Sequence, residues 1–150
     1  VVALAGDGGL AMLLGELLTV RQLKLPVKLV VFNNSSLNFV ELEMKAAGIV
    51  TFGTDLVNPD FAAVAQSMGV FGRRVTEPGQ LEGALTEAFA HDGPAVVDVV
   101  TARQELSIPP AITVEQAKGF SLYAIRTILA GRADELLDLV STNVARRILD

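Results

Sequence analysis

Strand-like and helix-like segments alternate along the first hundred residues of this chain, and the alternation limits its possible folds more than any other feature. Apolar, β-prone runs occupy residues 1–5, 27–32, 70–75 and 95–100. Between them, apolar residues recur at the i, i+3, i+4 spacing of helices that cover a core. Strands separated by helices form parallel sheets with both faces covered. The sequence therefore predicts an α/β fold, a parallel sheet sandwiched by helices.

The expected helices have recognisable limits. The first two span residues 10–23 and 37–47. Asn58-Pro59-Asp60 is typical of an N-cap followed by proline at the first helical position, and Thr76 is expected to cap the next helix. The residues expected to face the core are Leu10, Leu13, Leu14 and Leu17, then Phe61, Val64, Ala65 and Met68, then Leu81, Ala84, Leu85, Ala88 and Phe89.

The helix at 37–47 carries charged residues that are expected to face solvent. Glu41, Glu43 and Lys45 predict a solvated helix face. Phe39 has two open interpretations, a core aromatic or a side chain near a bound reaction intermediate.

Two polar turns follow the first two expected strands. Gly6-Asp7-Gly8-Gly9 comes after the run at 1–5, and Asn33-Asn34-Ser35-Ser36 comes after the run at 27–32. Ligands bind at the carboxyl ends of strands in open parallel sheets. Asp7 and Asn34 offer hard oxygen atoms to a divalent cation, and glycine lets backbone N–H groups approach a phosphate. The pair predicts a site for a diphosphate held through Mg²⁺ or a similar ion.

Each turn alone has a simpler interpretation. The first is also compatible with a tight strand-to-helix turn in which Asp7 is the N-cap, and the second with plain turn formation. Their joint occurrence at this spacing favours the ligand site. The first turn lacks the glycine spacing of dinucleotide-binding folds and the Gly-Lys-Ser/Thr ending of a P-loop, which excludes both motifs.

Composition excludes several classes of function. The chain has 150 residues, a net charge of −5 and no cysteine. The acidic balance argues against a nucleic-acid surface, and the lack of cysteine excludes disulfides and thiolate metal sites and fits a cytoplasmic protein. Mean hydropathy is +0.46, yet no apolar run approaches the ~20 residues of a membrane span. Because Val1 lies within or at the edge of a strand, we expect the chain to continue a longer polypeptide.

The last third differs in character, so the sequence predicts two parts, 1–101 and 102–150. Ile108-Pro109-Pro110-Ala111 predicts an extended connector. Thr113 and Gln116 predict a capping box that opens a helix to residue 130, and a second helix is expected at 133–148. The apolar side chains expected along one face of that last helix are Leu136, Val140, Val144 and Ile148. Two hypotheses stay open: this face packs on the enzyme or a neighbouring subunit, or it makes reversible peripheral contact with a membrane.

Gly6-Asp7-Gly8 followed by Asn33-Asn34 resembles the cofactor motif of thiamine diphosphate-dependent enzymes. The resemblance implies the thiamine diphosphate-binding fold with a C-terminal helical extension, and the cofactors thiamine diphosphate and Mg²⁺. It implies that Asp7, the Asn34 side chain and the Ser36 backbone carbonyl bind the metal. The cofactor-binding residues that it implies are Gly6, Asp7, Gly8, Gly9, Asn33, Asn34 and Leu37. Asn33 is expected to act mainly as a turn and hydrogen-bonding residue.

Longer stretches resemble the pyruvate oxidase and pyruvate dehydrogenase (quinone) branch of that family. They are residues 25–39, 92–99, 115–121 and the tail from 108 to 143. This resemblance implies oxidative decarboxylation of pyruvate, with electrons passing to FAD and then to quinone or oxygen. The FAD domain and the catalytic glutamate are expected outside this chain, which is therefore expected to be inactive alone.

The same resemblance implies a homo-oligomer. The location expected from the lack of cysteine is the cytoplasm, and the tail raises a peripheral position at the inner face of the membrane as an option. Two alternatives remain. One is the same domain of an acetolactate synthase or another 2-oxo acid decarboxylase. The other is a non-catalytic binding domain.

Overall fold

The computed structural model describes residues 1–104 and 113–149, and their packing forms two units. The sheet unit comprises Val1–Ser36 and Leu56–Thr101. The helical unit comprises Leu37–Asp55 and the described residues from Ala102 onward. The second unit therefore takes in a segment from the middle of the chain as well as the tail. Whether 1–101 and 102–150 fold as separate domains remains a prediction.

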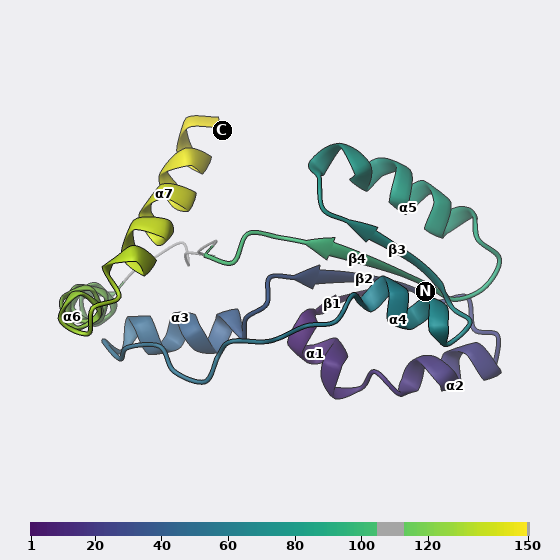
Figure 1. The fold of residues 1–150 in the computed structure, drawn as a ribbon, viewed down its shortest axis with the longest axis horizontal. Helices are drawn as coiled ribbons and strands as arrows, with labels where there is room; N and C mark the ends of the chain where they lie inside the picture. The colour runs from purple at the N-terminus through teal and green to yellow at the C-terminus, as the bar shows by residue number, and fades with distance from the viewer. Residues whose placement is uncertain (105–112, 150) are drawn as a thin grey trace. The chain divides into compact units, whose positions relative to one another are not determined.

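The sheet unit contains four parallel strands in the order β1-β2-β4-β3. The strands are β1 (Val2–Gly6), β2 (Lys28–Asn33), β3 (Phe71–Val75) and β4 (Ala95–Val100). In register, Gly6 lies opposite Phe32, and Asn33 lies opposite Val100. All four carboxyl ends therefore meet at one edge of the sheet (Figure 1). The predicted parallel α/β fold is confirmed.

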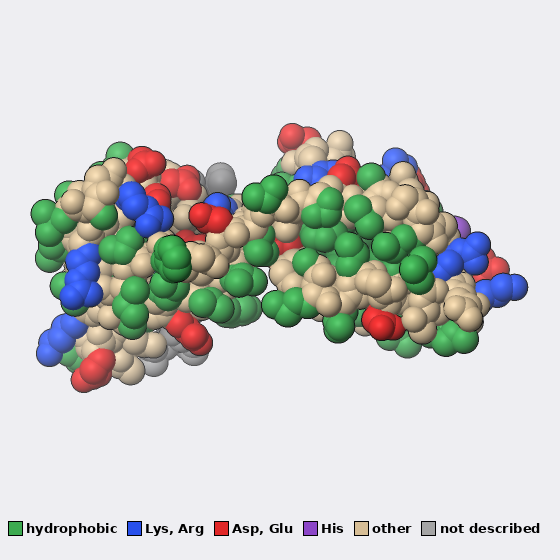
Figure 2. Space-filling view, turned by 60° about the horizontal axis from the view of Figure 1, so that its bottom comes forward, with side chains coloured by type: hydrophobic (Ala, Val, Ile, Leu, Met, Phe, Trp, Pro, Cys, Tyr) green, Lys and Arg blue, Asp and Glu red, His purple; other side chains and the backbone are tan. Residues whose placement is uncertain are grey.

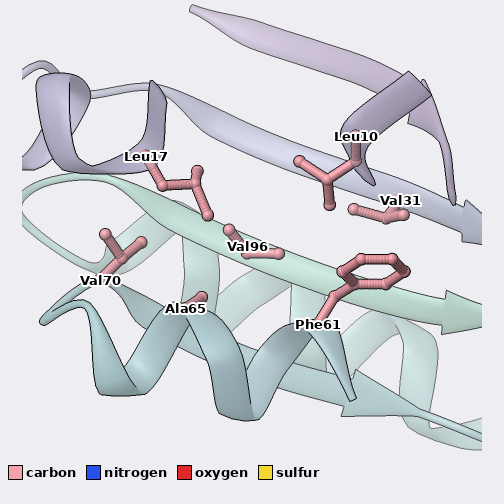
Figure 3. Packing of buried hydrophobic residues seen from close by; sticks show 7 residues of the cluster. All are labelled: Leu10, Leu17, Val31, Phe61, Ala65, Val70 and Val96. Carbon is pink, nitrogen blue, oxygen red and sulfur yellow. The ribbon is translucent and has the colours of Figure 1, made fainter. Parts of the chain in front are cut away.

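Helices cover both faces of the sheet. On one face lie α1 (Asp7–Met12), α2 (Glu16–Gln22) and α4 (Phe61–Ser67), and on the other lies α5 (Leu81–Ala90), which follows a short 3-10 turn, η1 (Pro78–Gln80) (Figure 1). The first face buries Leu10, Leu17, Val31, Phe61, Ala65, Val70 and Val96 (Figure 3). The second buries Val75, Ala84, Ala88, Ala95 and Val97. Neighbouring residues of β4 thus point into opposite cores, as the two-residue period of a strand requires.

Three sequence expectations about this unit were wrong. The helix expected at 10–23 begins at Asp7 and breaks at residues 13–15, where Leu13 leaves the helical region (φ −124°) and Gly15 has low helix propensity. Because of that break, Leu13 is 67% exposed. In α5, Leu81 and Phe89 were also expected to face the core, but both are exposed. Thr76 is not a cap: Glu77 takes that position in a capping box with Gln80, with Pro78 following it.

The helical unit is built from α3 (Asn38–Ala46), α6 (Val114–Leu129) and α7 (Ala133–Leu149). The capping box of Thr113 and Gln116 is confirmed at the start of α6. The expected connector at 108–111 lies outside the described residues. None of the described helices is long and apolar enough to cross a membrane.

The interior of the helical unit contains the charges that were expected in solvent. Glu41 and Lys45 are 2% and 1% exposed, and the Lys45 Nζ lies 2.7 Å from a carboxylate oxygen of Glu41. The same Nζ donates to Oε1 of Gln104 at 2.8 Å and lies 5.8 Å from the centre of the Tyr123 ring. The predicted solvated face was therefore wrong for these two residues, because α6 and the segment at Gln104 cover them. Phe39 is 78% exposed and is not a core aromatic.

The described part of α7 matches its predicted apolar face only in part. Leu136 is half-buried as expected, but Val140 is 58% exposed, and Leu139, outside the predicted set, is buried at 8% exposed. The side chains of Val144 and Ile148 lie outside the described residues. Contact of this helix with a membrane remains a prediction.

Candidate functional site

The two polar turns lie together at the carboxyl edge of the sheet. Because β1 and β2 are hydrogen-bonded neighbours, the turns that leave them are neighbours too. A direct bond joins the turns: the backbone N–H of Ser35 donates to Oδ2 of Asp7 at 2.7 Å. The expectation that the two turns lie side by side is therefore confirmed within the sheet unit.

Asp7 holds a buried carboxylate at the start of α1. Gly6 occupies the N-cap position, so Asp7 is the first helical residue and not the cap. Its side chain is only 3% exposed. Three N–H groups donate to it: Gly8 to Oδ1 at 2.9 Å, and Ser35 and the Asn58 amide to Oδ2, each at 2.7 Å.

No lysine or arginine pairs with Asp7 among the residues that the structure describes. A buried carboxylate is costly unless its charge is compensated. Three neutral donors stabilise the charge in part, and a bound cation would compensate it directly. The electrostatics of the site therefore favour a cation beside Asp7.

The second turn bends sharply after β2. Oδ1 of Asn34 accepts the N–H of Ser36 at 3.0 Å, an arrangement in which an asparagine side chain closes a turn. Ser35 has a φ of 57°, in the left-handed region, and Ser36 is buried at 3% exposed. Leu37 begins the helical unit, where its N–H donates to the carbonyl of Thr54 at 2.9 Å.

Two glycines of the first turn, Gly6 and Gly9, face open space, whereas Gly8 is buried. A Cβ at Gly6 or Gly9 would meet no atom within 4 Å, and neither residue has a positive φ. Gly72 is different, because a Cβ there would overlap the carbonyl oxygen of Ala62. Internal packing thus explains Gly72 but not Gly6 or Gly9. Bare backbone beside open space allows the N–H groups of this turn to approach a ligand closely.

The donor set suits Mg²⁺. Among the described residues there is no cluster of three or more His, Cys, Asp or Glu side chains that could hold a metal. Mg²⁺ needs no such cluster, because it is commonly bound through one or two carboxylates with the remaining positions filled by water and phosphate oxygens. The carboxylate of Asp7, the amide oxygen of Asn34 and the carbonyl oxygen of Ser36 are hard oxygen donors of the kind that Mg²⁺ binds.

Sequence reasoning missed a residue that touches both turns. Asn58 was expected to cap α4, but Asp60 is the cap, accepting the N–H of Ala63 at 2.9 Å. The Asn58 amide instead donates to Asp7 and, at 2.9 Å, to Oδ1 of Asn33. No local signal indicated this, since its partners lie 51 and 25 residues away.

Asp98 is the other missed residue, and it anchors the far side of Asn33. It is fully buried at 0% exposed, in the middle of β4. Oδ1 accepts the Asn33 amide at 2.9 Å, and Oδ2 accepts Nη1 of Arg74 at 2.5 Å and the N–H of Phe61 at 3.2 Å. One signal was available: a carboxylate inside an otherwise apolar strand requires a partner.

Comparison with known proteins identifies the family of this chain. A sequence profile of the family described as "Thiamine pyrophosphate enzyme, C-terminal TPP binding domain" matches residues 1–99. The chain belongs to the thiamine pyrophosphate enzymes. The match includes both polar turns, Asn58 and Asp98.

Individual relatives of this thiamine pyrophosphate domain agree with the assignment. YdaP of Bacillus subtilis (strain 168), named as a thiamine pyrophosphate-containing protein, is 38% identical over 138 residues, which cover 92% of this chain and 24% of YdaP. The acetolactate synthase isozyme 2 large subunit of Escherichia coli (strain K12) is 36% identical over 103 residues, 66% of this chain and 18% of that subunit. The chain thus spans about a quarter or less of these relatives.

A solved structure shows the same fold. The thiamine diphosphate-dependent 4-hydroxybenzoylformate decarboxylase of Rhodococcus jostii RHA1 superposes with a TM-score of 0.63 at 28% identity, over 67% of this chain and 19% of that one. These relatives establish the thiamine pyrophosphate domain. They do not single out the pyruvate oxidase branch.

Proposed function

We propose that this chain anchors the diphosphate of thiamine pyrophosphate through Mg²⁺ in an enzyme that decarboxylates a 2-oxo acid. The observation that carries the proposal is the buried Asp7 carboxylate, which has N–H donors but no cationic side chain among its described partners. Because the chain belongs to the thiamine pyrophosphate family, thiamine pyrophosphate is the cofactor that such a site would hold.

Each residue of the site has a proposed role. Asp7, the Asn34 side chain and the Ser36 carbonyl bind the metal, and the backbone of Gly8 and Gly9 lies against the diphosphate. The N–H of Gly8 already donates to Oδ1 of Asp7, so Gly9 is the exposed backbone of this turn that a phosphate can approach. When bound, the cofactor supplies an electron sink for decarboxylation. The contribution of this chain is to fix one end of the cofactor, so that the reactive ring is held in one orientation.

For the reaction we propose the oxidative decarboxylation of pyruvate, with FAD on another part of the full polypeptide and quinone or oxygen as the final acceptor. The match to YdaP covers 92% of this chain and so extends into its last third, whereas the match to the acetolactate synthase subunit covers 66%. The tail that suggested the oxidase branch is thus shared more fully with YdaP than with that acetolactate synthase subunit. Because the second of these relatives is named as an acetolactate synthase subunit, acetolactate synthesis is the alternative reaction.

A homo-oligomer is part of the same proposal. Apolar side chains are exposed on the face of the sheet unit seen in Figure 2. Within that unit Leu4, Met12 and Leu13 are 68%, 76% and 67% exposed, and β1 is an edge strand. Exposed apolar surface and an unpaired strand edge are features that proteins normally cover with further structure.

The reaction is tested by product analysis on the natural full-length polypeptide supplied with thiamine pyrophosphate, Mg²⁺ and pyruvate. We expect acetate or acetyl phosphate to form together with a reduced artificial acceptor. Acetolactate formed without any acceptor would establish the alternative. Absence of both products, with cofactor bound, would contradict the choice of pyruvate.

A further inference from the structure

Four side chains form a continuous hydrogen-bonded row that starts at the carboxyl edge of the sheet and ends inside β4. The row runs from Asp7 through Asn58 and Asn33 to Asp98. Asp7, Asn33 and Asp98 are each no more than 3% exposed, and Asn58 is half-buried. Asp98 has a cationic partner in Arg74, at 2.5 Å, whereas Asp7 lies at the end of the row that faces the proposed metal.

The chemistry of the two ends fixes the orientation of the amides between them. An ionised carboxylate only accepts hydrogen bonds. Asp7 therefore requires the NH₂ group of Asn58, and Asp98 requires the NH₂ group of Asn33. The oxygen of Asn33 is left to accept the second hydrogen of Asn58 at 2.9 Å. Both Asn58 hydrogens are thus used, and no other assignment satisfies both carboxylates.

Counting lone pairs shows what Asn58 does to Asp7. A carboxylate has about four acceptor positions, two on each oxygen. Oδ2 receives two donors, from Ser35 and Asn58, and Oδ1 receives one, from Gly8. Oδ2 is therefore saturated, and Oδ1 keeps one lone pair for another ligand.

We propose that Asn58 is a positioning residue that occupies Oδ2 of Asp7 and so leaves Oδ1 as the single oxygen available to a cation. The inference rests on the proposed function, because it assumes that Asp7 binds a metal. The consequence is a preference of the site for one divalent cation over another. Mg²⁺ takes single oxygens in near-octahedral geometry, whereas Ca²⁺ readily accepts both oxygens of one carboxylate. By blocking Oδ2, Asn58 favours Mg²⁺ over Ca²⁺.

The test replaces Asn58 and measures two metals separately. In the natural full-length polypeptide, thiamine pyrophosphate binding is titrated by calorimetry with either Mg²⁺ or Ca²⁺ as the only divalent ion. For Asn58→Ala we expect the Mg²⁺-supported affinity to fall about 10-fold or more, the usual effect of removing a group that orients a metal ligand. The Ca²⁺-supported affinity should fall much less, because a freed Oδ2 permits two-oxygen binding.

Asn58→Ser, which is small, polar and well tolerated in loops, provides a second variant with the same expected shift. Asp60→Ala is the matched control, since it removes the cap of α4 from the same loop without touching Asp7. It should lower the melting temperature and leave the ratio of Mg²⁺ to Ca²⁺ affinity unchanged. A change in this ratio is an effect that general destabilisation would not produce.

The outcomes separate this inference from the proposed function. Equal weakening with both metals, or no change with either, in the Asn58 variants would overturn the positioning role. If the unmodified protein binds no thiamine pyrophosphate with either metal, or if Asp7→Ala binds as well as the unmodified protein, the proposed function itself fails.

Discussion

At the scale of single residues, the charged interior of the helical unit gives the sharpest stability prediction. Lys45→Met removes the ammonium group 2.7 Å from the buried Glu41 carboxylate. We expect the free energy of unfolding to fall by about 3 kcal/mol, since breaking a buried ion pair leaves a charge without its counterion. Urea denaturation followed by circular dichroism measures this loss.

Two companion variants make that measurement specific. The double variant Glu41→Gln with Lys45→Met removes both charges and should recover most of the loss. Glu43→Gln changes an exposed residue of the same helix and should alter the free energy of unfolding by less than about 0.5 kcal/mol. A Lys45→Met effect no larger than that of Glu43→Gln would show that the pair is not buried in solution.

Tyr123 gives a prediction for pH. Burial raises the pKa of its hydroxyl above the ordinary value of 10.0, and the carboxylates of Glu135 and Glu41 act in the same direction. The folded chain therefore keeps the proton at a pH where the unfolded chain has lost it. The free energy of unfolding should be unaffected by this group below pH about 10 and should fall as the pH rises above that value.

Tyr123→Phe should remove this decline, as judged by urea denaturation of the 150-residue chain at pH about 9 and about 11. Because Tyr123 is the only tyrosine and tryptophan is absent, ultraviolet absorbance also follows its ionisation directly. Ionisation of the folded chain at or below the ordinary pKa would contradict the buried placement.

The residue scale also shows where local sequence patterns stop being informative. Asp7 and Asn34 were predicted because each follows a strand in a recognisable turn. Glu41 and Lys45 have the spacing of an exposed ion pair, and only the packing of α6 and Gln104 buries them. Asn58 has the spacing of a helix cap, and only the fold brings it to Asp7. The missed roles are those set by partners distant in sequence.

At the scale of elements, two helical glycines predict opposite effects of the same substitution. At Gly119 of α6 a Cβ would overlap the carbonyl oxygen of Ala46 in α3. Gly119→Ala should therefore push the two helices apart and lower the free energy of unfolding by about 1–3 kcal/mol.

Gly83 of α5 is the matched control, because a Cβ there would meet no atom within 4 Å. Gly83→Ala should raise the free energy of unfolding by about 0.5–1 kcal/mol, since alanine favours helix. Urea denaturation of both variants tests the pair, and a stabilising Gly119→Ala would exclude the close approach of α3 and α6.

The elements themselves were mostly predictable. All four strands and the helices at 37–47 and after Asn58 follow from apolar periodicity and turn residues. The helix expected at 10–23 was the exception, because four leucines supply an unbroken stripe while Gly15 and Leu13 interrupt the backbone. Side-chain periodicity alone does not report such a break.

At the scale of the whole molecule, the parallel order of the strands explains why the site exists. Parallel β1 and β2 end at the same edge, so turns 24 residues apart in the chain become neighbours. The same topology brings Asp98 of β4 beside Asn33 of β2. The α/β architecture and the family were accessible from the sequence, whereas the reaction depends on parts of the enzyme outside this chain.

The central claim is that Asp7 and its neighbours bind thiamine pyrophosphate through a metal, and calorimetric titration of the natural full-length polypeptide tests it most directly. Asp7→Ala removes the one carboxylate among the three proposed metal ligands and should weaken Mg²⁺-dependent cofactor binding at least about 10-fold, as loss of a charge-assisted contact does. Asn34→Ala should act in the same direction. Cofactor affinity that is unchanged in both variants, or that does not depend on Mg²⁺ in the unmodified protein, would contradict the account.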